Sequence, residues 1–126
     1  MRGGAEGRAQ TNAKRSPLFE PIRFATATFE APLNCTVHGF AGTFESVLYK
    51  DVTISIAPQS HTEGMFSWFP LFIPLTNPVR VQKGDEITVS VWRCCDARKV
   101  WYEWGLTSPV VSPIQNSGGA TFSMLL

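Results

Sequence analysis

Long hydrophobic runs and an excess of charge of one sign are both absent from this sequence of 126 residues. Its most apolar stretch, residues 69–75, is interrupted by two prolines and falls short of the roughly 18–20 residues that span a bilayer, so we expect no membrane partner. Lysine and arginine together number 11, against 10 aspartates and glutamates. Because proteins neutralise phosphates with clustered basic residues, this balance also predicts no nucleic-acid partner.

Cysteine is scarce, and residues 1–6 contain no apolar stretch of the kind found in secretory signals. The 3 cysteines are an odd number that does not form a disulfide framework, which favours a reducing compartment. We therefore expect the protein in the cytoplasm or the nucleus.

Charge is uneven along the chain, because residues 1–23 hold five basic and two acidic residues. Residues 1–16 contain no aromatic residue and too little apolar surface to offset the entropy of ordering. We therefore expect residues 1–23 to be a disordered basic lead-in. A basic arm that contacts phosphate or an acidic partner is the alternative.

Helical periodicity is missing, whereas period-two alternation recurs from residue 24 onward. In residues 86–92 the side chains of Ile87, Val89 and Val91 share one face, as in a half-buried strand. Similar patterns predict strands at residues 24–30, 36–49, 52–57, 66–75, 79–81, 99–106 and 119–126. The sequence therefore predicts an all-β domain over residues 24–126, an antiparallel β-barrel or sandwich.

Turn residues agree with this assignment. The sequence Lys83-Gly84-Asp85 predicts a tight hairpin between strands 79–81 and 86–92. Residues 57–60 predict the end of strand 52–57. Glycines inside a strand commonly mark a bulge or a bend, which we expect at Gly39 and Gly42.

No catalytic, cofactor or metal site follows from the residues alone. The sequence has no glycine-rich turn between a strand and a helix that would cradle a nucleotide-like cofactor. Cys35, His38, Cys94 and Cys95 are zinc-binding residue types, but adjacent strand residues point to opposite faces, so the last two do not suit one ion. We expect His38 to be a hydrogen-bonded structural group and Glu103 an exposed or rim carboxylate on a strand.

The most distinctive segment is aromatic. Within residues 64–70, the side chains of Phe66, Trp68 and Phe69 place three aromatic rings in four positions. One use is a buried plug that closes the end of a barrel. The other is an exposed lip on which an indole receives a cation, an interaction worth about 0.5–2 kcal/mol. The residues alone leave both open.

Several blocks of sequence carry a resemblance to a known family. The blocks are His38-Gly39-Phe40-Ala41-Gly42 and residues 44–49, 64–70, 92–94 and 99–104. In this order they resemble the C-terminal, oligomerisation β-barrel of the protein arginine N-methyltransferase 5 family, the symmetric-dimethylating type II enzymes. The resemblance covers residues 24–126 and implies the antiparallel β-barrel of the arginine methyltransferase C-terminal type.

The resemblance implies a part in protein arginine methylation. In this family a preceding domain binds S-adenosylmethionine and holds the substrate guanidinium between glutamates, so no catalytic or cofactor-binding residue is expected in this chain. We expect a substrate-lip and oligomerisation domain that is inactive alone. The implied partners are an arginine-containing protein substrate and a methyltransferase catalytic domain or a second copy.

Individual roles carry over only onto the aromatic segment. Trp68 resembles the tryptophan that stacks on the target arginine, and Ser67 and Phe69 resemble neighbours whose backbone holds the substrate peptide. Phe66-Ser67-Trp68 resembles the symmetric branch, whereas asymmetric-dimethylating relatives read Thr-His-Trp. The small serine leaves room that histidine would fill, which we expect to affect the product.

Two functions of other classes stay open. A free-standing β-sandwich would capture a peptide or a sugar on Phe66, Trp68 and Phe69 and remain a stable monomer. A structural interaction protein would instead use exposed apolar surface to associate with itself or with a partner.

Overall fold

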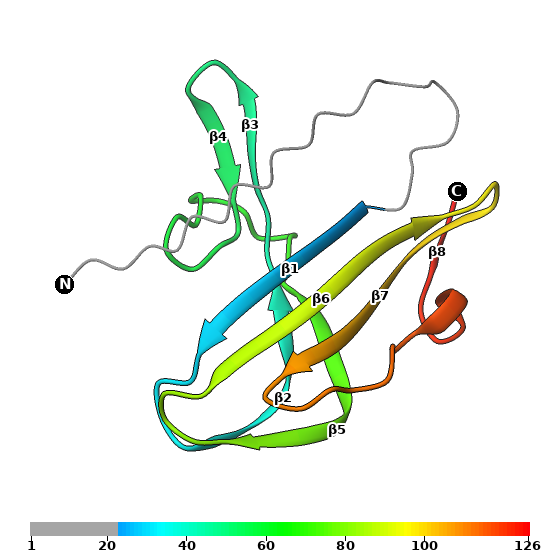
Figure 1. Cartoon of the computed structure of the whole chain (residues 1–126). Helices are drawn as coiled ribbons and strands as arrows, with labels where there is room; N and C mark the ends of the chain where they lie inside the picture. Colours follow the sequence, from blue (N-terminus) through cyan, green and yellow to red (C-terminus); the bar gives the residue numbers. More distant parts are fainter. Residues whose placement is uncertain (1–22) are drawn as a thin grey trace. The chain divides into compact units, whose positions relative to one another are not determined.

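The computed structural model describes residues 23–126, which form strands joined by loops and one short 3₁₀ helix, η1 (Ser117–Gly119) (Figure 1). The all-β prediction is confirmed. The strands in chain order are β1 (Arg23–Glu30), β2 (Cys35–Gly42), β3 (Glu45–Tyr49), β4 (Val52–Ser55), β5 (Leu71–Val81), β6 (Glu86–Cys95), β7 (Lys99–Ser108) and β8 (Met124–Leu125). The expected lead-in lies outside the described residues, apart from residue 23, which begins β1.

The described chain divides into two compact units. The sheet unit combines residues 23–35 with Arg80–Leu126, and the hairpin unit is Thr36–Val79. The strands form a sheet in the order β1-β6-β7-β8 and two two-stranded pairs, β2-β5 and β3-β4. None of these three sheets closes into a barrel within the described residues.

The sheet unit is organised around the long strands β6 and β7, which pair antiparallel along most of their length (Figure 1). On the other side of β6, β1 pairs in continuous antiparallel register from Arg23 opposite Arg93 to Glu30 opposite Glu86. The predicted face of β6 is largely buried, because Ile87 and Val89 are both buried. Further buried apolar residues of this unit are Ala31, Val81, Cys94, Val100, Trp104 and Leu106.

The chain after β7 folds back along that strand. Gln115 forms a bridge with Trp104, and η1 then follows. The side chain of Asn116 makes four hydrogen bonds, donating to the carbonyls of Tyr102 and Phe122 and accepting from the N–H groups of Thr121 and Phe122. Asparagine has two donors and an acceptor oxygen with two lone pairs, so the side chain is fully used.

The hairpin unit contains the β3-β4 hairpin and the β2-β5 pair. Gly39 in β2 lies where the two strands of that pair approach closely, because a Cβ atom built on it would be 2.5 Å from the carbonyl oxygen of Ile73. Any side chain at this position would collide with backbone. Close approach of β5 therefore accounts for the glycine at position 39, whereas the bulge or bend expected there stays a prediction.

Three local predictions need correction. Residues 83–85 do turn, but β5 and β6 do not pair, so they are not a hairpin; β6 pairs with β1 and β7. The turn instead hydrogen-bonds to the segment after β1, through Gly84 N to Ala31 O and Lys83 N to Asn34 Oδ1. The predicted strand 66–75 begins only at Leu71 and continues through the predicted strand 79–81 as β5. The predicted strand 119–126 is reduced to the two residues of β8, Met124–Leu125, after η1. The run 36–49 is interrupted after Gly42, as expected there, and forms β2 and β3.

Candidate functional site

The aromatic segment, residues 64–70, ends the long loop between β4 and β5 in the hairpin unit. Hydrogen bonds to Ser55, which is 2% exposed, hold the first half of this loop in place. Its hydroxyl accepts the N–H of Ala57 at 3.1 Å and lies 2.8 Å from the hydroxyl of Ser60. Its N–H donates to Thr62 Oγ1 and its carbonyl accepts the N–H of Thr62, both at 2.9 Å. The buried Ser55 therefore holds the first half of the loop through both its side chain and its backbone.

Two more contacts tie the loop to β3 and to the residue before it. Ser60 Oγ donates to Glu45 Oε2 at 2.8 Å, and Ile56 N donates to the carbonyl of Phe44 at 3.0 Å. The hydrogen bond from Ser60 N to Ala57 O, at 3.1 Å, closes the predicted turn at residues 57–60. The loop that leads to the aromatic segment is thus held at several points.

The aromatic segment itself leaves the loop through a tight turn. Gly64 has a φ of +83°, a conformation that glycine adopts without steric cost, and its carbonyl accepts the N–H of Phe66 at 3.0 Å. The exposed fractions that follow are 86% for Phe66, 58% for Trp68 and 78% for Phe69, and Ser67 is also exposed. A buried plug requires rings shielded from solvent, and in the described chain these three rings are exposed.

The indole of Trp68 packs against one aromatic neighbour, Phe44. The Phe44 ring meets it edge-on, with ring centroids 5.4 Å apart and planes at 73°. Such edge-to-face pairs are worth about 0.5–1.5 kcal/mol beyond their buried area. An indole that is orientated by a neighbour and still open to solvent can receive a flat cationic group on its electron-rich face.

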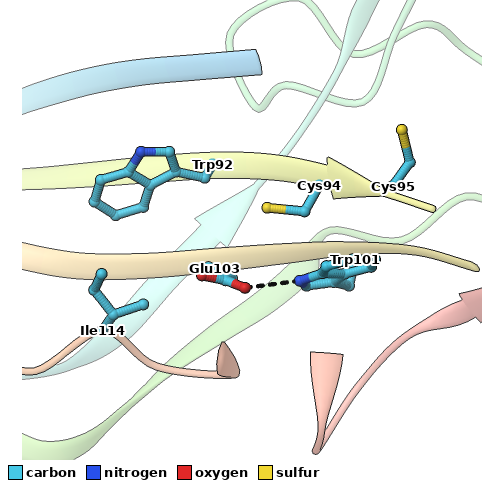
Figure 2. A pocket seen from close by; sticks show the side chains of 6 residues that line it. All are labelled: Trp92, Cys94, Cys95, Trp101, Glu103 and Ile114. Atoms are coloured by element: carbon cyan, nitrogen blue, oxygen red, sulfur yellow. Dashed lines mark hydrogen bonds between the residues drawn. The ribbon is translucent and has the colours of Figure 1, made fainter. Parts of the chain in front are cut away.

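A second group of side chains lines an open pocket of about 350 Å³ in the sheet unit (Figure 2). The lining residues are Trp92, Cys94, Cys95, Trp101, Glu103 and Ile114. The β6–β7 register places Cys94 opposite Trp101 and Trp92 opposite Glu103, so these four share one face of the sheet. Figure 2 shows the side chain of Cys95 pointing away from that of Cys94, as expected for neighbours on a strand.

Glu103 is a half-buried carboxylate with defined partners. Its Oε1 accepts the indole N–H of Trp101 at 2.9 Å and the backbone N–H of Gly118 at 2.8 Å. The nearby thiol of Cys94 is buried, and this burial, together with the negative charge of Glu103, raises its pKa above the ordinary value. The thiol is therefore neutral at physiological pH, and Glu103 is the charged group of the pocket lining.

The residues weighed as metal ligands do not gather in one place. Cys35 is exposed, Cys94 is buried, and His38 is exposed on β2. Within residues 23–126 no group of three or more His, Cys, Asp or Glu side chains could hold a metal ion. In the same part of the chain, no helix has the length and apolar character to cross a membrane.

Together, these observations define an all-β domain with an anchored, exposed aromatic segment. A sequence profile of the family described as the PRMT5 oligomerisation domain matches residues 9–124, so the chain belongs to that family. This match begins within the segment expected to be a lead-in.

Similar proteins include protein arginine N-methyltransferase 5 of three organisms. The Xenopus laevis protein is 49% identical over 110 residues, which cover 87% of this chain and 17% of the relative. The Oryza sativa subsp. indica protein is 50% identical over 110 residues, 85% of this chain and 17% of the relative. The Drosophila melanogaster protein is 42% identical over 113 residues, 89% of this chain and 18% of the relative. The chain thus spans less than a fifth of the length of these relatives.

Sequence reasoning missed the residues that hold the two sites in place. Phe44, just before β3, contacts Trp68, and Ser55, at the end of β4, bonds to residues 57, 60 and 62 of the loop ahead of the aromatic segment. No local sequence pattern marks such contacts. Glu103, expected as an exposed or rim carboxylate on a strand, is half-buried and accepts the N–H of Gly118. The turn-forming residues Asn116-Ser117-Gly118-Gly119 are the sequence signal that could have found this turn.

Proposed function

We propose that this chain is the substrate-lip and oligomerisation β-domain of a symmetric protein arginine methyltransferase, which transfers methyl groups from S-adenosylmethionine to protein arginine. Membership of the PRMT5 oligomerisation-domain family supports the parent activity. The observation that carries the substrate role is the exposed indole of Trp68, orientated by Phe44 on a loop anchored at Ser55.

The proposed role of the aromatic segment is to orientate the substrate arginine. A guanidinium is planar, weakly hydrated and always charged, so it stacks on an indole face. Phe66 and Phe69 flank Trp68 and enlarge the apolar surface that excludes water from the cation. The exposed Ser67 between them leaves space beside the guanidinium, and we propose that this space favours symmetric dimethylation.

The chemistry belongs to the parent enzyme. When bound there, S-adenosylmethionine supplies the methyl group: the arginine nitrogen forms a bond to the methyl carbon, the sulfur–carbon bond breaks, and the nitrogen then loses a proton. The contribution of this chain is orientation, which matters because a displacement requires the reacting atoms in line. We propose that the β-domain alone does not transfer methyl groups, and methylation of an Arg-Gly peptide by the purified chain would contradict this.

Oligomerisation is the second part of the proposal. Apolar side chains gather on the β3–β4 hairpin, where each of four is more than half exposed: Val47, Leu48, Tyr49 and Val52. Exposed apolar surface of this kind favours association, and the family description names oligomerisation. Sedimentation of Leu48→Asp beside the unchanged chain tests it: a lower oligomeric state supports the proposal. A stable monomer in both favours a free-standing binding module instead.

The substrate role is tested by Trp68→Leu in the full-length methyltransferase that carries this domain. Losing a cation–π contact worth about 0.5–2 kcal/mol should lower kcat/KM for an arginine peptide by about 2- to 30-fold. Trp68→Phe should retain part of the rate because a ring remains. Phe122→Leu, an exposed aromatic residue in the other unit, is the matched control. A rate of Trp68→Leu equal to that of the control would overturn the proposed role.

The product role of Ser67 needs its own measurement. Ser67→His in the same full-length enzyme should shift the product from symmetric to asymmetric or monomethyl arginine, scored by mass spectrometry of the peptide. Unchanged symmetric product would remove Ser67 from the proposal. The compartment, cytoplasm or nucleus, stays a prediction that microscopy of the tagged protein can test.

A further inference from the structure

The pocket between Trp92 and Trp101 is made by residues that the proposed function does not use. All six lining residues belong to the sheet unit, whereas the aromatic segment belongs to the hairpin unit. Its walls are mostly apolar, and the two indoles come from neighbouring antiparallel strands of one sheet, β6 and β7. This combination raises the question of what such a pocket can bind.

The charge of the pocket favours a cation. Glu103 is an acid among otherwise uncharged lining residues, because burial keeps the thiol of Cys94 neutral. No basic residue belongs to the lining. Lys99 lies beside the lining: its Nζ is 4.8 Å from the centroid of the Trp101 ring and donates to the carbonyl of Gly118, so one part of this ring already contacts a cation.

The carboxylate is fixed before any ligand arrives. Trp101 Nε1 and Gly118 N both donate to Oε1, which sets the position of the group (Figure 2 shows the first of these bonds). Among the described residues no hydrogen bond is made to the other oxygen, Oε2. A preorganised carboxylate with one oxygen to spare loses little conformational freedom when it binds a donor.

The apolar walls select the kind of cation. A metal ion needs several oxygen, nitrogen or sulfur ligands, and within residues 23–126 no three His, Cys, Asp or Glu side chains are grouped so as to hold one. A guanidinium is weakly hydrated, stacks on aromatic rings and donates to carboxylate oxygens, so it suits both the indoles and the carboxylate of this lining. We propose that the pocket binds a guanidinium group, with Glu103 as its counter-ion and Trp92 and Trp101 as aromatic walls.

The first test compares a charged ligand with its neutral isostere. N-acetyl-arginine amide and N-acetyl-citrulline amide are titrated into the full chain while NMR records the indole N–H signals of the tryptophans. We expect the signals of Trp92 and Trp101 to move with the arginine ligand, and the citrulline ligand to bind at least fivefold more weakly. Equal affinities for the arginine and citrulline ligands, or for the arginine ligand and a norleucine amide, would overturn the proposal. The pocket would then not discriminate between a charged and a neutral ligand.

The second test removes the charge of Glu103 and keeps its shape. Glu103→Gln retains an acceptor oxygen for Trp101 and Gly118, so the thermal midpoint should change little. Arginine affinity should fall about fivefold to tenfold, because a charged acceptor becomes neutral. Glu30→Gln removes the same charge from an exposed position on β1 and should not change the affinity. Unchanged affinity in Glu103→Gln would refute the site.

Two further variants keep the result interpretable. If Glu103→Gln unfolds, Trp92→Phe and Trp92→Leu replace it. Trp92→Phe keeps an aromatic ring and should retain arginine binding, whereas Trp92→Leu should lose it. Equal affinity of the two variants would contradict the proposal. The separate indole signals distinguish this pocket from the aromatic segment, because those of Trp92 and Trp101 should move with the arginine ligand whether or not that of Trp68 moves. Movement of the Trp68 signal alone would place the guanidinium there and overturn the proposal. An Arg-Gly peptide that binds more tightly than the amide identifies a peptide ligand; equal affinity identifies free arginine-like molecules, and both support the site.

Discussion

Replacing Asn116 tests whether one side chain holds the returning segment against β7. The residue has a φ of +55°, in the left-handed region that asparagine tolerates better than alanine. Its Nδ2 donates to the carbonyls of Tyr102 and Phe122, both at 2.8 Å, and its Oδ1 accepts the N–H groups of Thr121 at 3.0 Å and Phe122 at 2.9 Å. Asn116→Gly removes the four bonds, and Asn116→Ala removes them and adds backbone strain.

The expected losses follow from these contacts. Each bond contributes about 0.5–1.5 kcal/mol net, and the lower half of that range applies because the residue is only half-buried and water can replace part of the network. Asn116→Gly should therefore lower the free energy of unfolding by roughly 2–4 kcal/mol. Asn116→Ala should lower it by about 1 kcal/mol more, the cost of a Cβ atom in the left-handed conformation.

Urea denaturation of the full chain, followed by tryptophan fluorescence, measures both variants. Asn77→Ala, at an exposed position on β5, is the control and should stay within about 0.5 kcal/mol of the unchanged chain. Two results would refute the reasoning. One is a loss below 0.5 kcal/mol in Asn116→Ala, and the other is an Asn116→Gly variant less stable than Asn116→Ala.

Further predictions concern a close approach and two titrating groups. Gly39→Ala should destabilise by about 1–3 kcal/mol, because its Cβ atom would lie 2.5 Å from a carbonyl oxygen, whereas at Gly42 the nearest atom is 3.4 Å away; equal losses in thermal melts of the two alanine variants would contradict this. The folded-state pKa of Cys94 is raised above its ordinary value of 9.0, so the unfolded chain releases this proton first and stability should fall as pH rises above 9.0. Cys94→Ala should flatten that alkaline slope in pH-dependent melts, and an unchanged slope would count against the assignment. The backbone N–H groups of Arg98 and Lys99 donate to Asp96 and lower the pKa of its carboxyl group. The stability that this carboxylate contributes is therefore present above the unfolded-state pKa and is lost as pH falls through the folded-state pKa. Asp96→Asn should remove this acid dependence, and a persisting dependence would assign it to another carboxyl group.

The sequence predicted the strands well and their partners poorly. Alternation is a local property, so residues 24–30, 86–92 and 99–106 were identified close to the observed β1, β6 and β7. Pairing is not local: β6 pairs with β1, and Thr28 bonds to Thr88 across 60 positions of sequence. A turn sequence such as Lys83-Gly84-Asp85 fixes a change of direction but does not fix which strands then pair.

The sequence predicted which residues make up the aromatic segment, but not the contacts that hold it in place. The aromatic residues 66–69 stand out because three rings in four positions are unusual in a loop. Their exposure was left open by the residues, since the same side chains also suit a plug. Trp68 contacts Phe44, and Glu103 bonds to Gly118. Each contact joins residues far apart in the sequence, so no local pattern predicts it.

The order of the two units along the chain has a further consequence. The hairpin unit, Thr36–Val79, is inserted between the two segments that build the sheet unit, so β1 and β6 must meet across this insertion. The entropy lost on closing a loop grows only logarithmically, by about 0.6 kcal/mol for each doubling of its length. Insertions and deletions in the β4–β5 loop should therefore cost the pairing of β1 with β6 little, which leaves the aromatic segment free to diverge while that sheet is maintained.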